Sequence, residues 1–166
     1  MSATFFVAAD VGRSVTASVR TIAAAGHDVQ LHCHRHVRHT LLREAEVERD
    51  ARAALEVIAA GGVSPTLWRT PWGVCTPATV RVARRLGLQI VRWDIDTHDW
   101  RGDTAPVMLA HVRRRFGAGG SVLMHDGLGP GGRRSGCENT VALIAPLVRV
   151  AAEHGLRIGP LAPARE

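Results

Sequence analysis

Residues 28–62 read DVQLHCHRHVRHTLLREAEVERDARAALEVIAAGG, and this stretch decides the fold. Residues 28–32 are a β-strand candidate, in which Val29 and Leu31 alternate with polar residues. Residues 41–60 place apolar side chains at helical spacing, and Gly61 and Gly62 end the predicted helix. A strand followed by a long helix is the repeating unit of α/β proteins.

The strand–helix unit recurs from one end of the chain to the other. Strands are predicted at residues 4–9, 28–32, 66–69, 88–93, 121–124 and 156–158, and helices at 14–25, 41–60, 77–87, 104–116 and 139–154. Thr76 and Pro77 give the third helix an N-cap followed by proline at its first position. Strands separated by helical crossovers predict a parallel sheet. Since no linker-like segment divides the chain, residues 1–166 are expected to form a single domain.

The composition argues against several classes of protein. Arginine supplies all 21 basic residues against 15 acidic ones, and the arginines are spread along the chain and mixed with acids, which argues against a nucleic-acid partner. No run approaches the ~20 apolar residues of a membrane span, and no signal peptide is evident, so a cytoplasmic location is expected by default. The three cysteines are widely spaced and predict neither a disulfide framework nor a thiolate zinc site.

Chemically useful side chains follow the predicted strands at the points where these strands end. In parallel α/β folds, active sites are built at the carboxyl ends of strands, so these residues are candidates for a common site. They are Asp10 after the first strand, His32 and His36 after the second, Arg69 at the end of the third, Asp96 and Asp99 after the fourth, and His125 and Asp126 after the fifth.

The densest of these groups is the histidine-rich segment HCHRHVRH at residues 32–39. In a helix, His32, His36 and His39 would share one face; in an extended chain, His32, His34 and His36 would do so. Either arrangement lets imidazoles converge, and neutral imidazole is a common zinc ligand. The alternative is a solvated loop rich in histidine, but this density directly after a strand favours a metal site.

The other candidates suit an acid–base reaction on a sugar. His125 can act as a general acid, and Asp96 can orient it and favour its charged form. Arg69 can pair with a carboxylate near a metal. Trp72 and Trp100 can offer apolar platforms to a sugar ring, although core packing explains each tryptophan equally well.

Four motifs occur in order over nearly the whole chain. They are Gly26-His27-Asp28 followed by His32 and His36, Arg69-Thr70-Pro71-Trp72-Gly73, the Asp-x-x-Asp-Trp pattern from Asp96 to Trp100, and Leu123-Met124-His125-Asp126. This ordered set resembles the polysaccharide deacetylase family, the NodB homology domain of carbohydrate esterase family 4. Residues 3–7 resemble the strand that follows the first motif of that family.

The resemblance implies a deformed β/α barrel and a metal-dependent hydrolase that removes N-acetyl groups from amino sugars or from a glycoconjugate. Chitin oligomers, peptidoglycan and glycosylated natural products are all substrates of the implied type. Carried over by motif, the site residues are His32 and His36 as ligands of a divalent metal, zinc; Arg69 as the residue that positions the catalytic carboxylate; His125 as the general acid, tuned by Asp96; and Trp72, Trp100 and Leu123 as substrate-binding side chains.

The chain also departs from the family pattern. The first motif, Thr-Phe-Asp-Asp-Gly, supplies the base and the third metal ligand, and nothing in residues 1–166 matches it. The expectation is therefore a barrel of about six strands, incomplete at its N-terminus, whose unpaired strand edge leads to a homodimer or to instability. Asp10 becomes the candidate for base or ligand, with His34 or His39 as further ligands. The alternative function is a non-catalytic or truncated relative that binds metal or carbohydrate without turnover.

Overall fold

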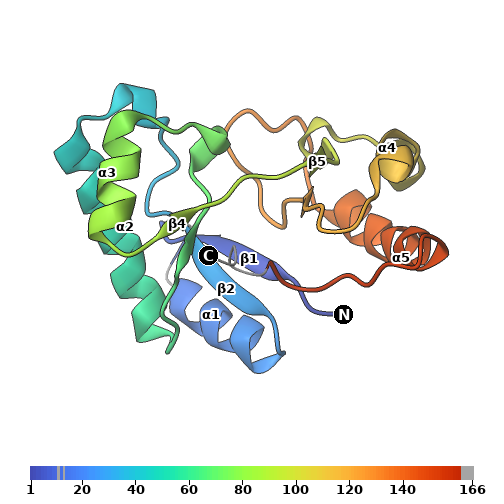
Figure 1. Ribbon diagram of the computed structural model, residues 1–166, viewed down its shortest axis with the longest axis horizontal. Coiled ribbons are helices and arrows are strands. Elements are labelled where there is room, and N and C mark those ends of the chain that lie inside the picture. Colours follow the sequence, from blue (N-terminus) through green and yellow to red (C-terminus); the bar gives the residue numbers. More distant parts are fainter. Residues whose placement is uncertain (11, 13, 162–166) are drawn as a thin grey trace. The chain divides into compact units, whose positions relative to one another are not determined.

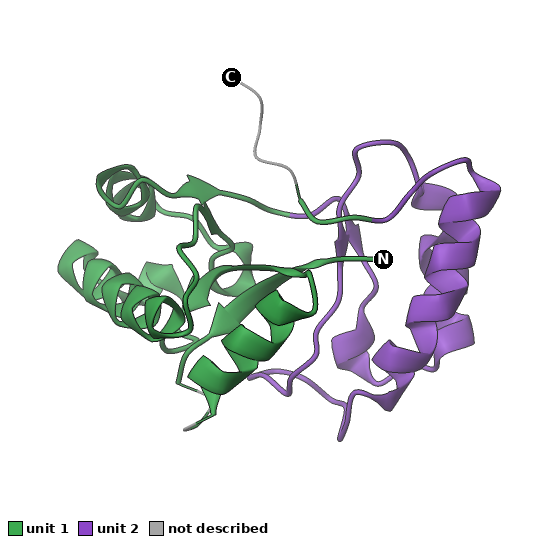
Figure 2. Cartoon of the chain, turned by 90° about the horizontal axis from the view of Figure 1, so that it is seen from below, with its two compact units in different colours: residues 1–92, 159–166 green, residues 93–158 purple. Residues whose placement is uncertain are grey.

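The computed structural model of the protein describes residues 1–10, 12 and 14–161. The chain divides into two compact units, residues 1–92 with 159–166, and residues 93–158 (Figure 2). Each unit contains its own cluster of buried apolar side chains. The single domain over residues 1–166 stays a prediction.

The first unit is built on a sheet of four parallel strands in the order β1-β2-β3-β4 (Figure 1). The strands are β1 (Thr4–Ala8), β2 (Asp28–Cys33), β3 (Leu67–Trp68) and β4 (Gln89–Ile90), and the helices between them are α1 (Val15–Ala24), α2 (Glu44–Ala60) and α3 (Pro77–Arg85). Helices α1 and α2 both contact β2, and α2 also contacts α3. Strand β2 therefore lies at the centre of the packing of this unit.

Local sequence signals set the ends of these helices. Thr76 caps α3, because its Oγ1 accepts a hydrogen bond from Thr79 N at 3.2 Å, while Thr79 Oγ1 accepts one from Thr76 N at 3.1 Å. This confirms the predicted start of α3 at Pro77. At the end of α2, a Cβ on Gly61 would lie 2.4 Å from Val19 Cγ1. Only glycine therefore allows α1 to pack this close to the end of α2.

The second unit holds a two-stranded parallel sheet and two helices. The strands are β5 (Ile95–Asp96) and β6 (Val122–Leu123), and the helices are α4 (Ala105–Val112) and α5 (Glu138–Glu153). Helices α4 and α5 pack against each other around Met108, Val112 and Leu143, all of which are buried. Short 3₁₀ helices complete the two units at His39–Leu41, Pro71–Gly73, Asp99–Arg101 and Arg113–Arg115.

The predicted class, an α/β fold with parallel strands, is confirmed, and the described chain contains six strands. Two details of the prediction are wrong. Residues 156–158 form no strand, because Gly155 turns at a φ of 69° and Leu156 N bonds back to Ala151 O at 2.8 Å. The sixth strand is instead β5, which is only two residues long and therefore shows no recognisable periodicity. Within the described residues, no helix has the length and apolar character to cross a bilayer.

Candidate functional site

Strand β2 and the turn after it bring two histidines of the first unit together. His32 is half-buried on β2, between the fully buried Leu31 and Cys33, so its ring projects from the other face of the sheet. The turn returns His36 to it, and the centroids of the two rings lie 5.0 Å apart. The chain is extended at His32, which excludes the helical arrangement of residues 32–39.

His39 does not join this pair. It is buried, its Nδ1 lies 3.0 Å from Thr79 Oγ1, and its ring packs on Trp68 with centroids 5.4 Å apart. Burial lowers the pKa of His39, although the nearby Asp50 acts in the opposite direction. His39 is therefore a neutral core residue, which links the 3₁₀ turn to α3.

The protonation of His32 follows from its neighbour. Its Nδ1 lies 2.5 Å from Arg69 O, and a carbonyl only accepts hydrogen bonds, so Nδ1 carries the proton. The lone pair is then on Nε2. Histidines that bind metals usually donate their other ring N–H to a carbonyl or carboxylate in this way. Trp68 Nε1 also donates to His32 O at 2.9 Å, which ties β2 to β3 a second time.

Trp72 lies against the second histidine. The ring centroids of Trp72 and His36 are 4.1 Å apart, and the Arg38 guanidinium carbon lies 4.7 Å from the Trp72 ring centroid. Trp72 has a φ of 53°, in the left-handed region that non-glycine residues rarely adopt. The strained turn thus holds the indole ring on His36. Its predicted contact with a sugar ring stays a prediction.

Arg69 and Asp10 both contact the histidine-rich segment of the first unit through their backbones. Arg69 is buried, its guanidinium carbon lies 4.1 Å from the Phe6 ring centroid, and burial lowers its pKa to about 10. Asp10 is exposed, and its backbone N donates to His34 O at 3.0 Å, so it lies directly beside the histidine turn. The roles of Arg69 in positioning a carboxylate and of Asp10 as base or ligand stay predictions.

The first unit therefore fits a metal in part. Two imidazoles converge, and the carbonyl oxygen of Arg69 fixes the proton of His32 on Nδ1. No group of three His, Cys, Asp or Glu side chains that could hold a metal occurs within residues 1–10, 12 and 14–161. Cys33 is excluded as a ligand, because burial and then the negative charge of Asp50 raise the pKa of its thiol far above the ordinary value.

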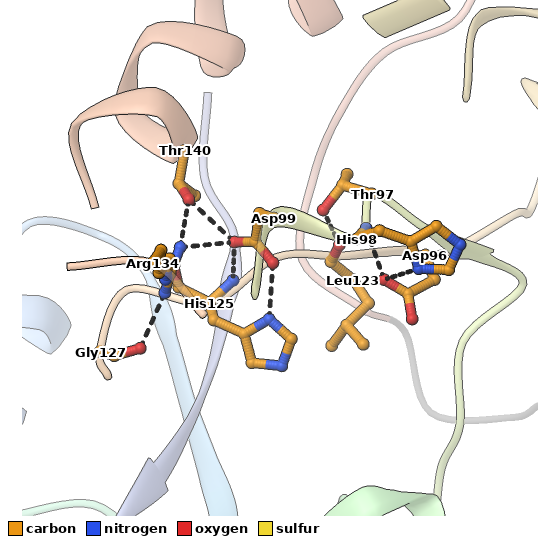
Figure 3. A network of polar contacts seen from close by, with 9 residues as sticks. All are labelled: Asp96, Thr97, His98, Asp99, Leu123, His125, Gly127, Arg134 and Thr140. Carbon is orange, nitrogen blue, oxygen red and sulfur yellow. Dashed lines mark hydrogen bonds and ion pairs between the residues drawn. The ribbon is translucent and has the colours of Figure 1, made fainter. Parts of the chain in front are cut away.

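A buried carboxylate organises the second unit (Figure 3). Asp99 accepts hydrogen bonds from His125 N and from His125 Nδ1, each at 2.7 Å, and from Thr140 Oγ1 at 2.9 Å. The Arg134 guanidinium donates a fourth bond at 3.0 Å. Burial acts to raise the pKa of Asp99, but the hydrogen bonds from His125 and Thr140 and the charge of His125 outweigh it, and the net effect is a lowered pKa.

His125 is both fixed and accessible. It lies two residues after the end of β6, and its side chain is 41% exposed although Asp99 beside it is completely buried. Figure 3 shows its Nδ1 edge toward Asp99 and its other ring nitrogen away from that carboxylate. Arg134 donates to His125 O at 2.8 Å and to Gly127 O at 2.7 Å, which fixes the backbone on both sides of Asp126. A histidine held in one tautomer with an accessible Nε2 is suited to proton transfer.

The structure pairs His125 with Asp99 and not with the partner predicted from the sequence. Asp96 was expected to orient this histidine, but Asp96 Oδ1 accepts a bond from His98 N at 2.7 Å and lies 3.3 Å from His98 Nδ1. The reason is the chain path: Asp96 ends β5, His98 turns at a φ of 56°, and Asp99 then enters the interior. Sequence reasoning also missed Arg134, since nothing in its spacing distinguishes it from its exposed neighbour Arg133.

The two remaining substrate-binding candidates of the second unit have different surroundings. Trp100 is half-buried, and the guanidinium carbon of Arg101 lies 5.1 Å from its ring centroid. Leu123 is buried on β6, and its carbonyl accepts a hydrogen bond from Thr97 Oγ1 at 2.8 Å. Their contacts with substrate stay predictions.

Comparison with known proteins gives one consistent family. Residues 1–91 match the model of the polysaccharide deacetylase family. A chitooligosaccharide deacetylase of Bradyrhizobium is 29% identical over 96% of this chain and 76% of its own length. A family 4 carbohydrate esterase from Streptomyces lividans, solved in complex with acetate, is 30% identical with a TM-score of 0.85, covering 98% of this chain and 80% of its own. A family 4 pseudoenzyme from Bacillus anthracis shares the fold at 23% identity and a TM-score of 0.85, over 97% of this chain and 54% of its own.

Proposed function

The chain belongs to the polysaccharide deacetylase family, and from this we propose that it is a metal-dependent hydrolase that removes N-acetyl groups from amino sugars or glycoconjugates. The observation that carries the proposal is the His125–Asp99 pair, in which a fully buried carboxylate holds a partly exposed histidine at the end of β6. The similarity to a chitooligosaccharide deacetylase of Bradyrhizobium supports the substrate class.

The proposed cofactor is a divalent metal, zinc, held by His32 and His36. The support is the convergence of the two rings and the carbonyl partner of His32 Nδ1. When bound, zinc polarises the acetyl carbonyl and lowers the pKa of a coordinated water. Since the described residues supply two ligands, the remaining positions belong to solvent, substrate or a further ligand, for which Asp10 is the candidate beside the histidine turn.

The side chains of the candidate site have separate parts in this proposal. His125 protonates the departing amine of the sugar through Nε2, and Asp99 keeps the proton of the other nitrogen in place. Arg134 and Thr140 satisfy the remaining oxygen of Asp99, so that this carboxylate stays oriented toward His125. Arg69 fixes His32 through its carbonyl oxygen, and Trp72 packs on His36.

A second function, binding of metal or carbohydrate without turnover, is favoured by one observation. The described residues offer two converging metal ligands rather than three, and no Asp-Asp motif occurs in the sequence. The pseudoenzyme from Bacillus anthracis is an example of this fold without native activity.

Metal stoichiometry tests the proposed cofactor before any substrate is chosen. We expect about one zinc per chain in the purified protein, and loss of that zinc in both His32→Ala and His36→Ala. Acetate release from N-acetylated chito-oligosaccharides by the zinc-loaded protein then tests turnover. Bound zinc without acetate release would favour the non-catalytic function, and a protein that binds no zinc would contradict the metal-dependent proposal.

A further inference from the structure

The turn after β2 is anchored by a carboxylate from another element. Asp50 lies on α2, is only 8% exposed, and accepts two backbone hydrogen bonds, from His34 N and from Arg35 N, each at 2.9 Å. These amides belong to the two residues that follow the end of β2 at Cys33. One side chain therefore accepts the hydrogen bonds of both amides at the end of the strand.

The two hydrogen bonds account for the burial of this charge. A carboxylate removed from water is unfavourable unless it is hydrogen-bonded, and charge-assisted bonds to backbone N–H groups are among the stronger compensations. The ion pair with Arg35 adds little to the stabilisation of Asp50, because Arg35 Nε lies 3.8 Å from Asp50 Oδ1 and the Arg35 side chain is 63% exposed. The backbone of the turn is therefore the main partner of Asp50.

The anchored amides lie between the two histidines. His32 stands on the regular strand, whereas His36 follows a tight turn in which Val37 N bonds to Arg35 O at 2.8 Å. Fixing the amides of His34 and Arg35 fixes the direction in which the chain leaves β2, and with it the 5.0 Å separation of the His32 and His36 rings. Between them, Cys33 is buried, and the largely exposed side chain of Arg35 adds only its 3.8 Å ion pair with the same Asp50.

We propose that Asp50 is a positioning residue of the histidine pair: its carboxylate holds the turn that sets His36 against His32. The placement of the two rings stands by itself, and the consequence for metal affinity rests on the proposed function. Residues that orient metal ligands from a distance typically change affinity by about 10–100-fold when they are replaced. Asn in place of Asp50 keeps the shape but replaces one acceptor oxygen with an NH₂ group, which opposes one of the two amides.

The first experiment titrates cobalt(II) into the full chain and follows both affinity and the visible absorption spectrum. We expect Asp50→Asn to weaken cobalt binding about tenfold or more and to change the spectrum. The matched control is Glu56→Gln, which removes the same charge from an exposed position on the same helix and should bind as the wild type does. Asp50→Glu, which keeps the charge, should recover part of the affinity. Wild-type affinity and spectrum in a folded Asp50→Asn protein would overturn the proposal, even if that protein is less stable.

A metal-free readout keeps this test separate from that of the proposed function. Amide hydrogen exchange should show the N–H groups of His34 and Arg35 protected in the wild type and exchanging about tenfold faster in Asp50→Asn, relative to the β2 amide of Val29. Contacts between the His32 and His36 rings, seen as NMR cross-relaxation, should weaken in the same variant. If the wild type binds no metal, the proposed function fails and these signals still decide the positioning role. If Asp50→Asn does not fold, Asp50→Glu supplies the comparison, and unprotected amides in the wild type would contradict the proposal directly.

Discussion

His32 in the first unit and His125 in the second are held through the same ring nitrogen but by different partners. His32 Nδ1 meets the neutral carbonyl oxygen of Arg69, whereas His125 Nδ1 meets the buried carboxylate of Asp99. A carbonyl fixes the tautomer without adding charge, which suits a neutral metal ligand. A carboxylate fixes the tautomer and offers an opposite charge whenever the ring is protonated, which suits proton transfer. The two residues are of the same type, and the group that contacts Nδ1, a carbonyl in one and a carboxylate in the other, distinguishes them.

The largest expected effect comes from removing each histidine in turn. His125→Ala should lower acetate release about 1000-fold, since a positioned general acid typically contributes 10²–10⁴, while zinc content stays at the wild-type level. His32→Ala is the matched variant and should lose zinc and activity together. Activity is measured on N-acetylated chito-oligosaccharides and zinc by elemental analysis. Loss of zinc in His125→Ala would mean that a ligand has been mistaken for an acid, and the contrast between the two units would fail.

A smaller effect is expected when the charged partner is neutralised. Asp99→Asn should reduce kcat about 100-fold, because the amide no longer stabilises the protonated ring and favours the wrong tautomer. Asp96→Asn is the control, since Asp96 contacts His98, and it should cost less than about tenfold. Steady-state kinetics of both variants decide the matter. The reverse order of effects would restore Asp96 as the functional partner of His125.

The carboxylate of the second unit also depends on its own cation. Arg134→Met removes a guanidinium from a pair whose two side chains are 6% and 0% exposed, and should lower the free energy of unfolding by about 3 kcal/mol. The neighbouring exposed residue provides the control, and Arg133→Met should change it by at most about 0.5 kcal/mol. Urea denaturation measures both. Equal effects would show that Asp99 does not need Arg134 to remain buried, which would weaken the contrast with the carbonyl-held His32.

His39, which contacts the hydroxyl of Thr79, extends the comparison to a third partner and gives the smallest expected effect. Because burial lowers its pKa below 6.5, the unfolded chain binds a proton there more readily than the folded one. Its contribution to stability is complete above pH 6.5 and is lost as the pH falls toward the lower, folded-state pKa. His39→Phe should therefore flatten the fall of the unfolding free energy as the pH drops below 6.5. An unchanged slope in urea denaturation would show that His39 does not titrate differently on folding.

The fold was predictable from the sequence where the signals are local. The capping pair at Thr76 and Pro77 and the glycines at the end of α2 determine helix ends within a few residues of chain, and the structure confirms them. Strand β5 was missed because two residues show no alternation, and its existence depends on pairing with β6, more than twenty-five residues away.

The candidate site was predictable in its residues but not in its contacts. The motif around residues 96–100 contains two carboxylates, and only the turn at His98 decides that Asp99 reaches His125. Asp50 contacts the histidine turn from 16 residues further along the chain, and Arg134 contacts Asp99 across 35 residues. Neither contact can be recognised from a local sequence pattern, because both join segments that come together only in the folded chain.

The thiol of Cys33, buried at the end of β2, makes this region open to chemical mapping. Cys75 is exposed, whereas Cys33 is buried and held far from its ionised form. Only the thiolate reacts with alkylating reagents, so they modify Cys75 in the folded protein and Cys33 only when β2 separates from its neighbours. A pulse of reagent followed by mass spectrometry therefore measures how often this strand opens.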